Sequence, residues 1–487
     1  MAANAVGRAP RRITWIAALL GGPSVSFALL IASPPDGLST KGWAIAAIAL
    51  WMAIWWMTEA IPLAATALLP LVLFPMLGID DLSSISQSYA HPLVFLFLGG
   101  FLLARAVTVW GLDRRIALQV LHLCGPGPRR IMAGIMLVTA FLSMWVSNTA
   151  TAMMMLPIAL SIIAAIHGSG ERGESTFPTA LLLAVAYAAS IGGMGTLVGT
   201  PPNALFAAYM ANSQGMEIGF AQWMVIGLPL VMLLLPLAWL CLVRTFRVPS
   251  RQSEHGASAI ESLRNELPPI SPAERMVAAV VGAVAVCWVG RPLLEDVWPD
   301  AGVSDPGIAL VGAIVLFAIP VDLRQGRFLL NWNEAATIRW DVLILFGGGL
   351  ALAATVADSD LTAWLAERLA GLGAYPVLVA LCVLGLLMVV VGELASNTAM
   401  AAVFLPLAGV TAVAMGEPAW SLALPAALFA TLGFMLPVGT PPNAVVFGSG
   451  VLSIKDMVRA GAILDLAGVF VVAAFVTLFG EALWTLF

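Results

Sequence analysis

The stretch GTPPN at residues 199–203 interrupts an apolar run, and it recurs unchanged at residues 439–443. Proline lacks an amide hydrogen and clashes with the preceding turn, so the incoming helix is expected to end near Gly199 or Gly439. Threonine suits the N-cap of the helix that follows, and proline suits its first position. Each copy therefore predicts a helix that breaks and restarts inside an apolar environment.

A second polar motif is also present twice. The stretch SNT at residues 147–149 recurs at residues 396–398. Each copy lies between two short apolar arms, residues 131–146 with 150–166 and residues 377–394 with 399–414. We interpret each pair of arms as a re-entrant hairpin with the polar tripeptide at its tip, where serine and asparagine can cap the returning helix.

The two motifs keep the same order in both halves, and a third pair, FLGG at 97–100 and FGGG at 346–349, precedes them. The sequence therefore predicts an internal repeat. We expect a first span within residues 1–41, a first repeat over 42–246, a cytoplasmic linker over 247–272 and a second repeat over 273–487. We place the hairpins at about 130–166 and 376–415, and the broken helices at about 177–212 and 420–452.

The composition favours lipid as the solvent, because 61% of the 487 residues are hydrophobic and only 10% are charged. Apolar runs of membrane-spanning length recur and predict an all-α polytopic membrane protein with about eleven spans and re-entrant segments. The net charge of −5 is spread thinly, so nucleic acid is not an expected partner. The four cysteines and four histidines show no disulfide or metal-ligand spacing.

Basic residues in short loops prefer the cytoplasmic side of a membrane. With the N-terminus in the cytoplasm, every lysine and arginine falls in a cytoplasmic segment except Lys41, Arg105, Arg291 and Arg368, and Arg105 falls within a span. If the hairpins do not cross, the C-terminus lies outside, and the two hairpins enter from opposite faces. The repeats are then inverted, as in many secondary transporters.

Broken helices at membrane depth leave backbone amides and carbonyls without partners, which costs several kcal/mol each in hydrocarbon. Two hairpin tips and two helix breaks can meet near the midplane. There the helix N-termini suit anionic oxygens, and the carbonyls that end the incoming arms suit sodium. The alternative is a set of kinked helices whose polar groups are satisfied by their neighbours. Four such features related by symmetry favour a binding site.

The doubled motifs resemble the divalent anion:sodium symporter family of dicarboxylate, tricarboxylate and sulfate carriers. The stretches WWMTEAIP at 55–62 and FLGGFLLA at 97–104 look like that family's early signatures, and the resemblance covers about residues 43–480. It implies a homodimer with an elevator mechanism, in which a unit carrying both hairpins slides against a fixed scaffold.

The resemblance also implies site residues. Those expected to contact the substrate anion are Ser147, Asn148, Thr149, Thr200, Pro201, Ser396, Asn397, Thr398, Thr440 and Pro441. One sodium site is expected at Ser143, Ser147, Asn148 and Gly199, and a second at Ala395, Asn397 and Gly439. In the family a hydroxyl residue often lies four residues before the second serine, but here that position is Gly392.

Several other polar residues receive structural interpretations. We favour a helix-end role for Glu59, and leave Glu393 open between inter-helix hydrogen bonding and sodium coupling. Asp113 and the two arginines after it are expected in an interfacial helix.

The leading hypothesis is a secondary active transporter of dicarboxylates such as succinate or malate, coupled to sodium and not an enzyme. The alternatives left open are a sodium-independent exchanger, a sulfate carrier, a passive anion channel and an intramembrane enzyme. No HExxH, GxSxG or Walker-type motif supports the last of these.

Overall fold

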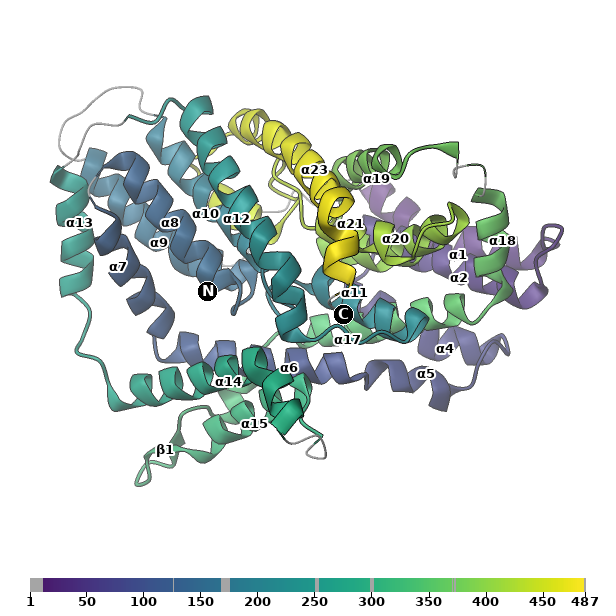
Figure 1. Ribbon diagram of the computed structural model, residues 1–487, viewed down its shortest axis with the longest axis horizontal. Helices are drawn as coiled ribbons and strands as arrows, with labels where there is room; N and C mark the ends of the chain where they lie inside the picture. The colour runs from purple at the N-terminus through teal and green to yellow at the C-terminus, as the bar shows by residue number, and fades with distance from the viewer. Residues whose placement is uncertain are drawn as a thin grey trace.

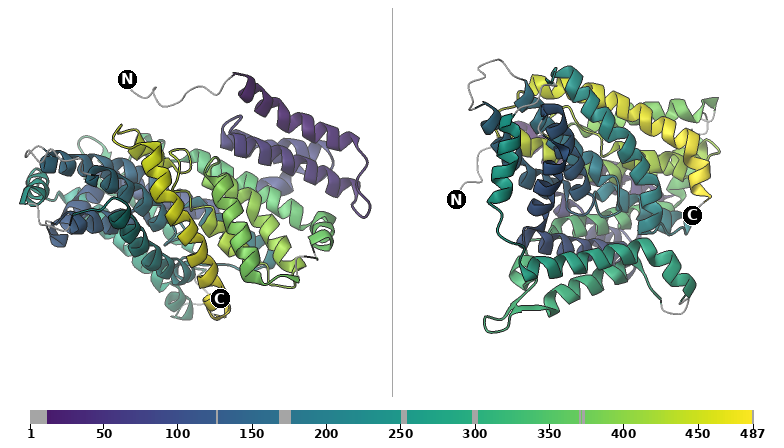
Figure 2. Two further views of the ribbon diagram at one scale, coloured as in Figure 1. Left: turned by 90° about the horizontal axis from the view of Figure 1, so that it is seen from above. Right: turned by 60° about the vertical axis from the view of Figure 1, so that its left-hand side comes forward.

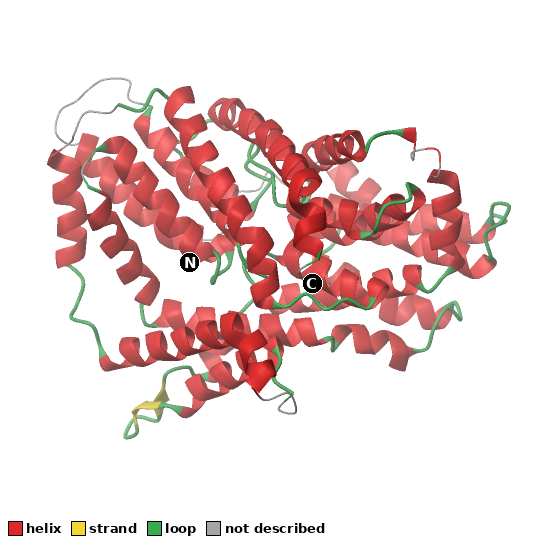
Figure 3. Cartoon of the chain, in the orientation of Figure 1, coloured by secondary structure: helices red, strands yellow, loops and turns green. Residues whose placement is uncertain are grey.

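The computed structural model describes residues 12–125, 127–167, 176–249, 254–297, 302–369, 371 and 374–485, and most of these residues are helical (Figure 3). The predicted all-helical architecture is confirmed. The described part departs from it only at a short antiparallel pair of strands, β1 (Pro320–Asp322) and β2 (Arg327–Phe328). Gly326, with a φ of 62°, permits the tight turn between them. The basic segment before Arg12 and residues 250–253 of the predicted linker lie outside the described residues.

The helices of the first half follow one another with short connections. They are α1 (Arg12–Ile31), α2 (Thr40–Thr58), α3 (Leu63–Thr66), α4 (Leu69–Met76), α5 (Leu82–Tyr89), α6 (Pro92–Val109), α7 (Leu112–Cys124), α8 (Pro128–Ser143), α9 (Asn148–His167), α10 (Phe177–Gly193), α11 (Pro201–Gln214), α12 (Phe220–Thr245) and α13 (Glu254–Asn265).

The second half repeats much of this order. Its helices are α14 (Pro272–Val297), α15 (Asp305–Ala318), α16 (Trp332–Ala335), α17 (Trp340–Ala357), α18 (Asp360–Leu369), α19 (Val377–Gly392), α20 (Asn397–Ala414), α21 (Trp420–Phe429), α22 (Pro441–Phe447) and α23 (Ile454–Trp484). The pairs α8–α9 and α19–α20 contain the SNT motifs, and the pairs α10–α11 and α21–α22 contain the GTPPN motifs.

Seven segments among the described residues are long and apolar enough to cross a membrane. They are Leu82–Val109, Asn148–Ile166, Phe220–Thr245, Pro272–Leu294, Trp340–Ala357, Asn397–Ala414 and Ile454–Trp484. Other apolar helices, such as α8, α10 and α19, are shorter. The chain is thus a multi-pass membrane protein, while the total of about eleven spans and re-entrant segments stays a prediction.

The centre of the molecule is built on α10 and α21. Every residue from Ala180 to Gly193 is buried, as is every residue of α21. Small side chains allow this depth, because Gly192 of α10 lies directly against the backbone of Ala140 in α8. A Cβ atom on Gly192 would lie only 2.3 Å from the Ala140 carbonyl oxygen. Each of these two short helices is therefore surrounded by protein, not lipid.

The two halves exchange contacts at their broken helices. The second part of the first broken helix, α11, packs against α17 and α20, whereas α22 of the second half packs against α9 and α10. In Figure 1 the helices α7 to α10 gather at one end and α17 to α20 at the other, with α11 and α21 between them. Figure 2 shows α1 and α2 side by side at the edge of the second group. Both halves therefore build the middle of the molecule.

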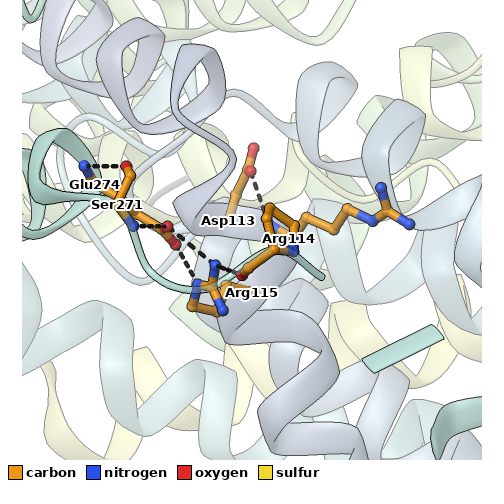
Figure 4. Close-up of polar contacts among 6 residues, drawn as sticks. Asp113, Arg114, Arg115, Ser271 and Glu274 are labelled. Carbon is orange, nitrogen blue, oxygen red and sulfur yellow. Dashed lines mark hydrogen bonds and ion pairs between the residues drawn. The ribbon is translucent and has the colours of Figure 1, made fainter. Parts of the chain in front are cut away.

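An ion pair ties α7 to the start of α14. The Arg115 guanidinium donates to both carboxylate oxygens of Glu274 and to the carbonyl of Pro268 at 2.8 Å (Figure 4). Ser271 caps α14 by accepting from the Glu274 amide at 3.1 Å. The neighbouring Asp113 is 5% exposed, and burial raises the pKa of its carboxyl group. These residues form a helix, as expected, and its polar contacts anchor it to the second half of the chain.

Candidate functional site

Both GTPPN stretches form breaks between two helices. In the first, α10 ends at Gly193 and α11 starts at Pro201 with Thr200 as N-cap. In the second, α21 ends at Phe429 and α22 starts at Pro441 with Thr440 as N-cap. The predicted proline starts are confirmed, and both threonines occupy the N-cap position, but only Thr440 makes a side-chain cap bond. The prediction that the incoming helices end near Gly199 and Gly439 is wrong, because both helices end earlier.

The early helix ends are explained by the asparagine of each motif. Asn203 is fully buried, and its side-chain nitrogen lies within hydrogen-bonding distance of the carbonyls of Gly193 (3.0 Å), Met194 (3.4 Å) and Thr196 (2.7 Å). Asn443 binds two carbonyls of the second break in the same way, at 2.9 and 3.0 Å. These bonds replace the helical ones, so several residues of loop are stable in a buried place.

The SNT stretches form short links between two helices. Ser147 and Ser396 precede the first residues of α9 and α20, which are Asn148 and Asn397. The amide of Ala150 donates to Ser147 Oγ at 3.4 Å. The cap predicted at the first tip is therefore present, whereas Ser396 makes no side-chain cap bond.

Both tips and both breaks meet at one cavity of about 200 Å³. The first residues of α9, α11, α20 and α22 line it, so four helix N-termini face one space. Its walls include Pro62, Leu63, Ala64, Phe101, Ser147, Asn148, Thr149, Val198, Gly199, Thr200, Pro201, Arg339, Asp341, Val342, Leu345, Ser396, Asn397, Thr398 and Pro441. Of the residues predicted to contact the anion, all but Thr440 line this cavity; Thr440 is 1% exposed.

One ion pair borders the cavity. The Arg339 side chain binds the Asp341 carboxylate through Nε at 2.9 Å and Nη2 at 2.8 Å, and both side chains are about half exposed. Because the Arg339 guanidinium is paired with Asp341, the polar groups on the walls that are left to bind a solute are hydroxyls, amides and backbone groups.

Oxygen atoms converge behind the first tip. One terminal atom of the Asn148 amide lies 2.6 Å from Ser143 Oγ, 3.1 Å from the Ala189 carbonyl oxygen and 3.2 Å from the Gly199 carbonyl oxygen. Ser143 is buried and also lies 2.7 Å from the Ala189 carbonyl. With the amide nitrogen in this position, the group is a set of hydrogen bonds. With the amide oxygen there, four oxygens lie close together, and oxygen atoms are the ligands that a hard cation prefers.

The second tip has a smaller version of the same cluster. One terminal atom of Asn397 lies 3.1 Å from both the Gly439 and the Ala430 carbonyl oxygens. The hydroxyl that Ser143 supplies in the first cluster is absent, because Gly392 occupies the matching position. Ala395 is 3% exposed beside this cluster. The residues present therefore fit a cation at both tips, with one oxygen fewer at the second.

Two carboxylates hold the second break from behind. Glu393 accepts hydrogen bonds from the amides of Met435 (2.7 Å) and Leu436 (2.6 Å), and Asp465 of α23 accepts from the Phe434 amide at 3.1 Å. Glu393 thus has a hydrogen-bonding role. Glu59, in contrast, is exposed at the C-terminal end of α2 with a φ of 47°, which places it at a helix end as predicted.

Sequence reasoning missed several parts of this site. The carbonyls of Ala189 and Ala430 take part through the backbone, and alanine carries no chemical signal of such a role. Arg339 and Asp341 flank the start of an apolar run, where charged residues usually indicate a membrane interface. Phe101 lies in the apolar segment after the first glycine pair, and only the packing of distant segments places it on the cavity.

The chain matches the family model described as "Sodium:sulfate symporter transmembrane region" over residues 19–486. It is 40% identical over 462 residues to the sodium-dependent dicarboxylate transporter SdcS of Staphylococcus saprophyticus, covering 93% of this chain and 89% of that protein. The protein of the same name from Staphylococcus aureus USA300 is 41% identical over 452 residues, covering 91% and 87%.

Two solved structures share the fold at low sequence identity. The MtrF protein of Neisseria gonorrhoeae has a TM-score of 0.55 at 12% identity, covering 96% of this chain and 95% of that one. The YdaH transporter of Alcanivorax borkumensis has a TM-score of 0.53 at 14% identity, covering 80% and 86%. The match to the family model and the identity with the two relatives, both over nearly the whole chain, establish that it belongs to the sodium:sulfate symporters, the divalent anion:sodium symporter family.

Proposed function

We propose that this chain is a secondary active transporter that carries a dicarboxylate of the succinate or malate class together with sodium. The observation that carries the proposal is the convergence of two SNT tips and two GTPPN breaks on one cavity of about 200 Å³. Two relatives at about 40% identity are named sodium-dependent dicarboxylate transporters, which supports the same substrate and ion.

The anion is held by neutral groups. Hydroxyls of serine and threonine, the two tip amides and the N-terminal turns of the helices present donors from both halves of the chain to the cavity. A dicarboxylate has a negative charge at each end, so one carboxylate can lie at each tip. Ser147, Asn148 and Thr149 serve one end, and Ser396, Asn397 and Thr398 serve the other.

Sodium occupies the oxygen clusters behind the tips. Ser143, Ser147, Asn148 and Gly199 hold it at the first cluster, and Ala395, Asn397 and Gly439 hold it at the second. Each cluster uses the asparagine that also faces the anion cavity. A bound cation orients that amide with its oxygen toward the cluster, so its nitrogen turns to the anion side. This shared residue couples the two solutes.

The proposed movement is of the elevator type in a homodimer, with the N-terminus in the cytoplasm, the C-terminus outside and the repeats inverted. α8 and α19 have 16 residues each, or about 24 Å of helix, which is short of a bilayer and suits re-entrant arms. The cross-packing of α22 on α9 and α10, and of α11 on α20, supports one moving unit that holds both tips.

The central test uses purified protein in liposomes. Labelled succinate uptake is measured for the parent, Asn148→Ala and Asn397→Ala, with the exposed Asn333→Ala as matched control. We expect both tip variants to lose at least about tenfold in uptake, the cost of one or two polar contacts, while Asn333→Ala stays at the parental rate. Parental uptake in either tip variant would refute the site.

Ion substitution separates the alternatives. Replacing sodium with choline should abolish net uptake by a symporter, whereas an exchanger would continue when succinate is present inside. A channel would show no counterflow of labelled against unlabelled succinate. Competition by sulfate and by citrate then ranks the anions, and a thermal-shift series with the same solutes gives an independent measure of binding.

A further inference from the structure

A second cavity of about 460 Å³ adjoins the site. It shares Phe101, Ser147, Thr149 and Arg339 with the first cavity, so the two lie side by side. Its other walls come from α6, from the first turns of α9 and from the residues before α17. They are Ala104, Arg105, Thr108, Val146, Ala150, Met153, Met154, Thr337 and Ile338. We call this second cavity the vestibule. It lies next to the first tip, because Ser147 and Thr149 line both cavities.

Arg105 is the unusual member of the vestibule. It lies inside α6, in a segment apolar enough to cross a membrane, where a cation is costly unless it serves a purpose. Its Nε atom is buried without a hydrogen-bond partner, and within the described parts of the chain no carboxylate forms an ion pair with it. The other vestibule arginine, Arg339, is paired with Asp341. Arg105 therefore leaves a positive charge unbalanced in the vestibule.

Arg105 lies close to the site along α6. Arg105 follows Phe101 by one helical turn, about 6 Å along the axis, and Phe101 lines both cavities. Side chains on a helix lean toward its N-terminus, which for Arg105 is the direction of Phe101 and the tips. A flexible arginine in this position can contact an anion that has not yet reached the SNT residues.

We propose that Arg105 forms an approach site for the transported dianion, binding one of its carboxylates in the vestibule before the anion passes to the two tips. The inference rests on the proposed dicarboxylate transport and adds a residue that none of the doubled motifs contains. A charge on the route concentrates the anion near the site, and accelerations of 10-fold or more are typical of such steering. The same attraction weakens as salt screens it.

The experiment measures the KM for succinate in liposomes at about 10 mM sodium, with sorbitol or with about 1 M choline chloride added. The Debye length falls from about 30 Å to about 3 Å between these conditions. The variants are Arg105→Gln, Arg105→Lys and, as matched control, Arg324→Gln, which removes an exposed arginine from the turn between β1 and β2. Thermal unfolding of each variant is measured alongside.

At low salt we expect Arg105→Gln to raise the KM on the order of tenfold, with Arg105→Lys and Arg324→Gln close to the parent. At high salt the KM of the parent should rise until it lies within about twofold of Arg105→Gln. Equal KM values for the parent and Arg105→Gln at low salt would overturn the proposal. So would a loss that is the same at both salt concentrations and in both Arg105 variants, because that pattern indicates a packing role.

Two further measurements keep the outcome clear. If Arg105→Gln does not fold, the salt dependence of the parental KM decides, and a KM that is unchanged between the two salt conditions overturns the approach site. If the parent takes up no succinate under any condition, the proposed transport function is refuted. If the parent transports succinate and Arg105→Gln has the same KM at low salt, only the approach site is refuted.

Discussion

The amide of Asn203 should be a principal support of the first helix break, and Asn203→Ala tests this. The side-chain nitrogen has two hydrogens and three carbonyls within 3.4 Å, in a residue that is fully buried. Removing it leaves about two buried carbonyls without a donor, and each costs about 1–3 kcal/mol. The expected loss of unfolding free energy is therefore about 2–6 kcal/mol.

The assay is thermal unfolding in detergent, followed by tryptophan fluorescence. Trp223 suits this, because its indole nitrogen donates to the Met194 carbonyl of the same break at 2.9 Å. We expect Asn203→Ala to lower the melting temperature by at least about 2 °C, scaling the usual relation to a chain of this size. The exposed Asn333→Ala should melt with the parent. If Asn203→Ala also melted with the parent, the amide would not support the break.

Three further predictions concern other contacts. Ser143→Ala, which removes an oxygen 2.6 Å from the Asn148 amide, should raise the sodium concentration for half-maximal uptake about tenfold or more; an unchanged sodium dependence would exclude Ser143 as a ligand. Glu274→Ala should cost about 3 kcal/mol in unfolding free energy, because it leaves Arg115 without its buried partner, whereas Asp341→Ala in an exposed pair should cost less than about 1 kcal/mol. Burial raises the pKa of Asp113 in the folded protein, so its contribution to stability is full below the unfolded pKa and is lost as the pH rises through the folded pKa. Asp113→Asn should therefore melt above the parent at about pH 8, and the difference should close toward about pH 4.

The sequence was sufficient to predict those features that depend on the local backbone preferences of particular residues. The proline pair after each threonine predicts the start of α11 and of α22, and an SNT stretch between apolar arms predicts a polar turn. The family and the helical architecture followed from such patterns, and all but one of the residues expected to contact the anion line the cavity.

The remaining features depend on contacts between distant segments. The ends of α10 and α21 are set by Asn203 and Asn443, whose amides reach back to carbonyls earlier in the chain. The Ala189 and Ala430 carbonyls join the oxygen clusters only because α10 and α21 end beside the tips. Thr440 was expected on the cavity, but the side chain turns inward to accept from the Asn443 amide at 3.4 Å.

The two buried asparagines also bear on how cargo is moved. Because Asn203 and Asn443 fix the backbone of each break from within the same helix pair, the cradle is already shaped before a solute arrives. Binding then costs little conformational entropy, because these two loops do not have to be ordered by the solute. A preformed site of this kind is compatible with the proposed elevator movement, in which the two breaks and the two tips would cross the membrane together as one unit.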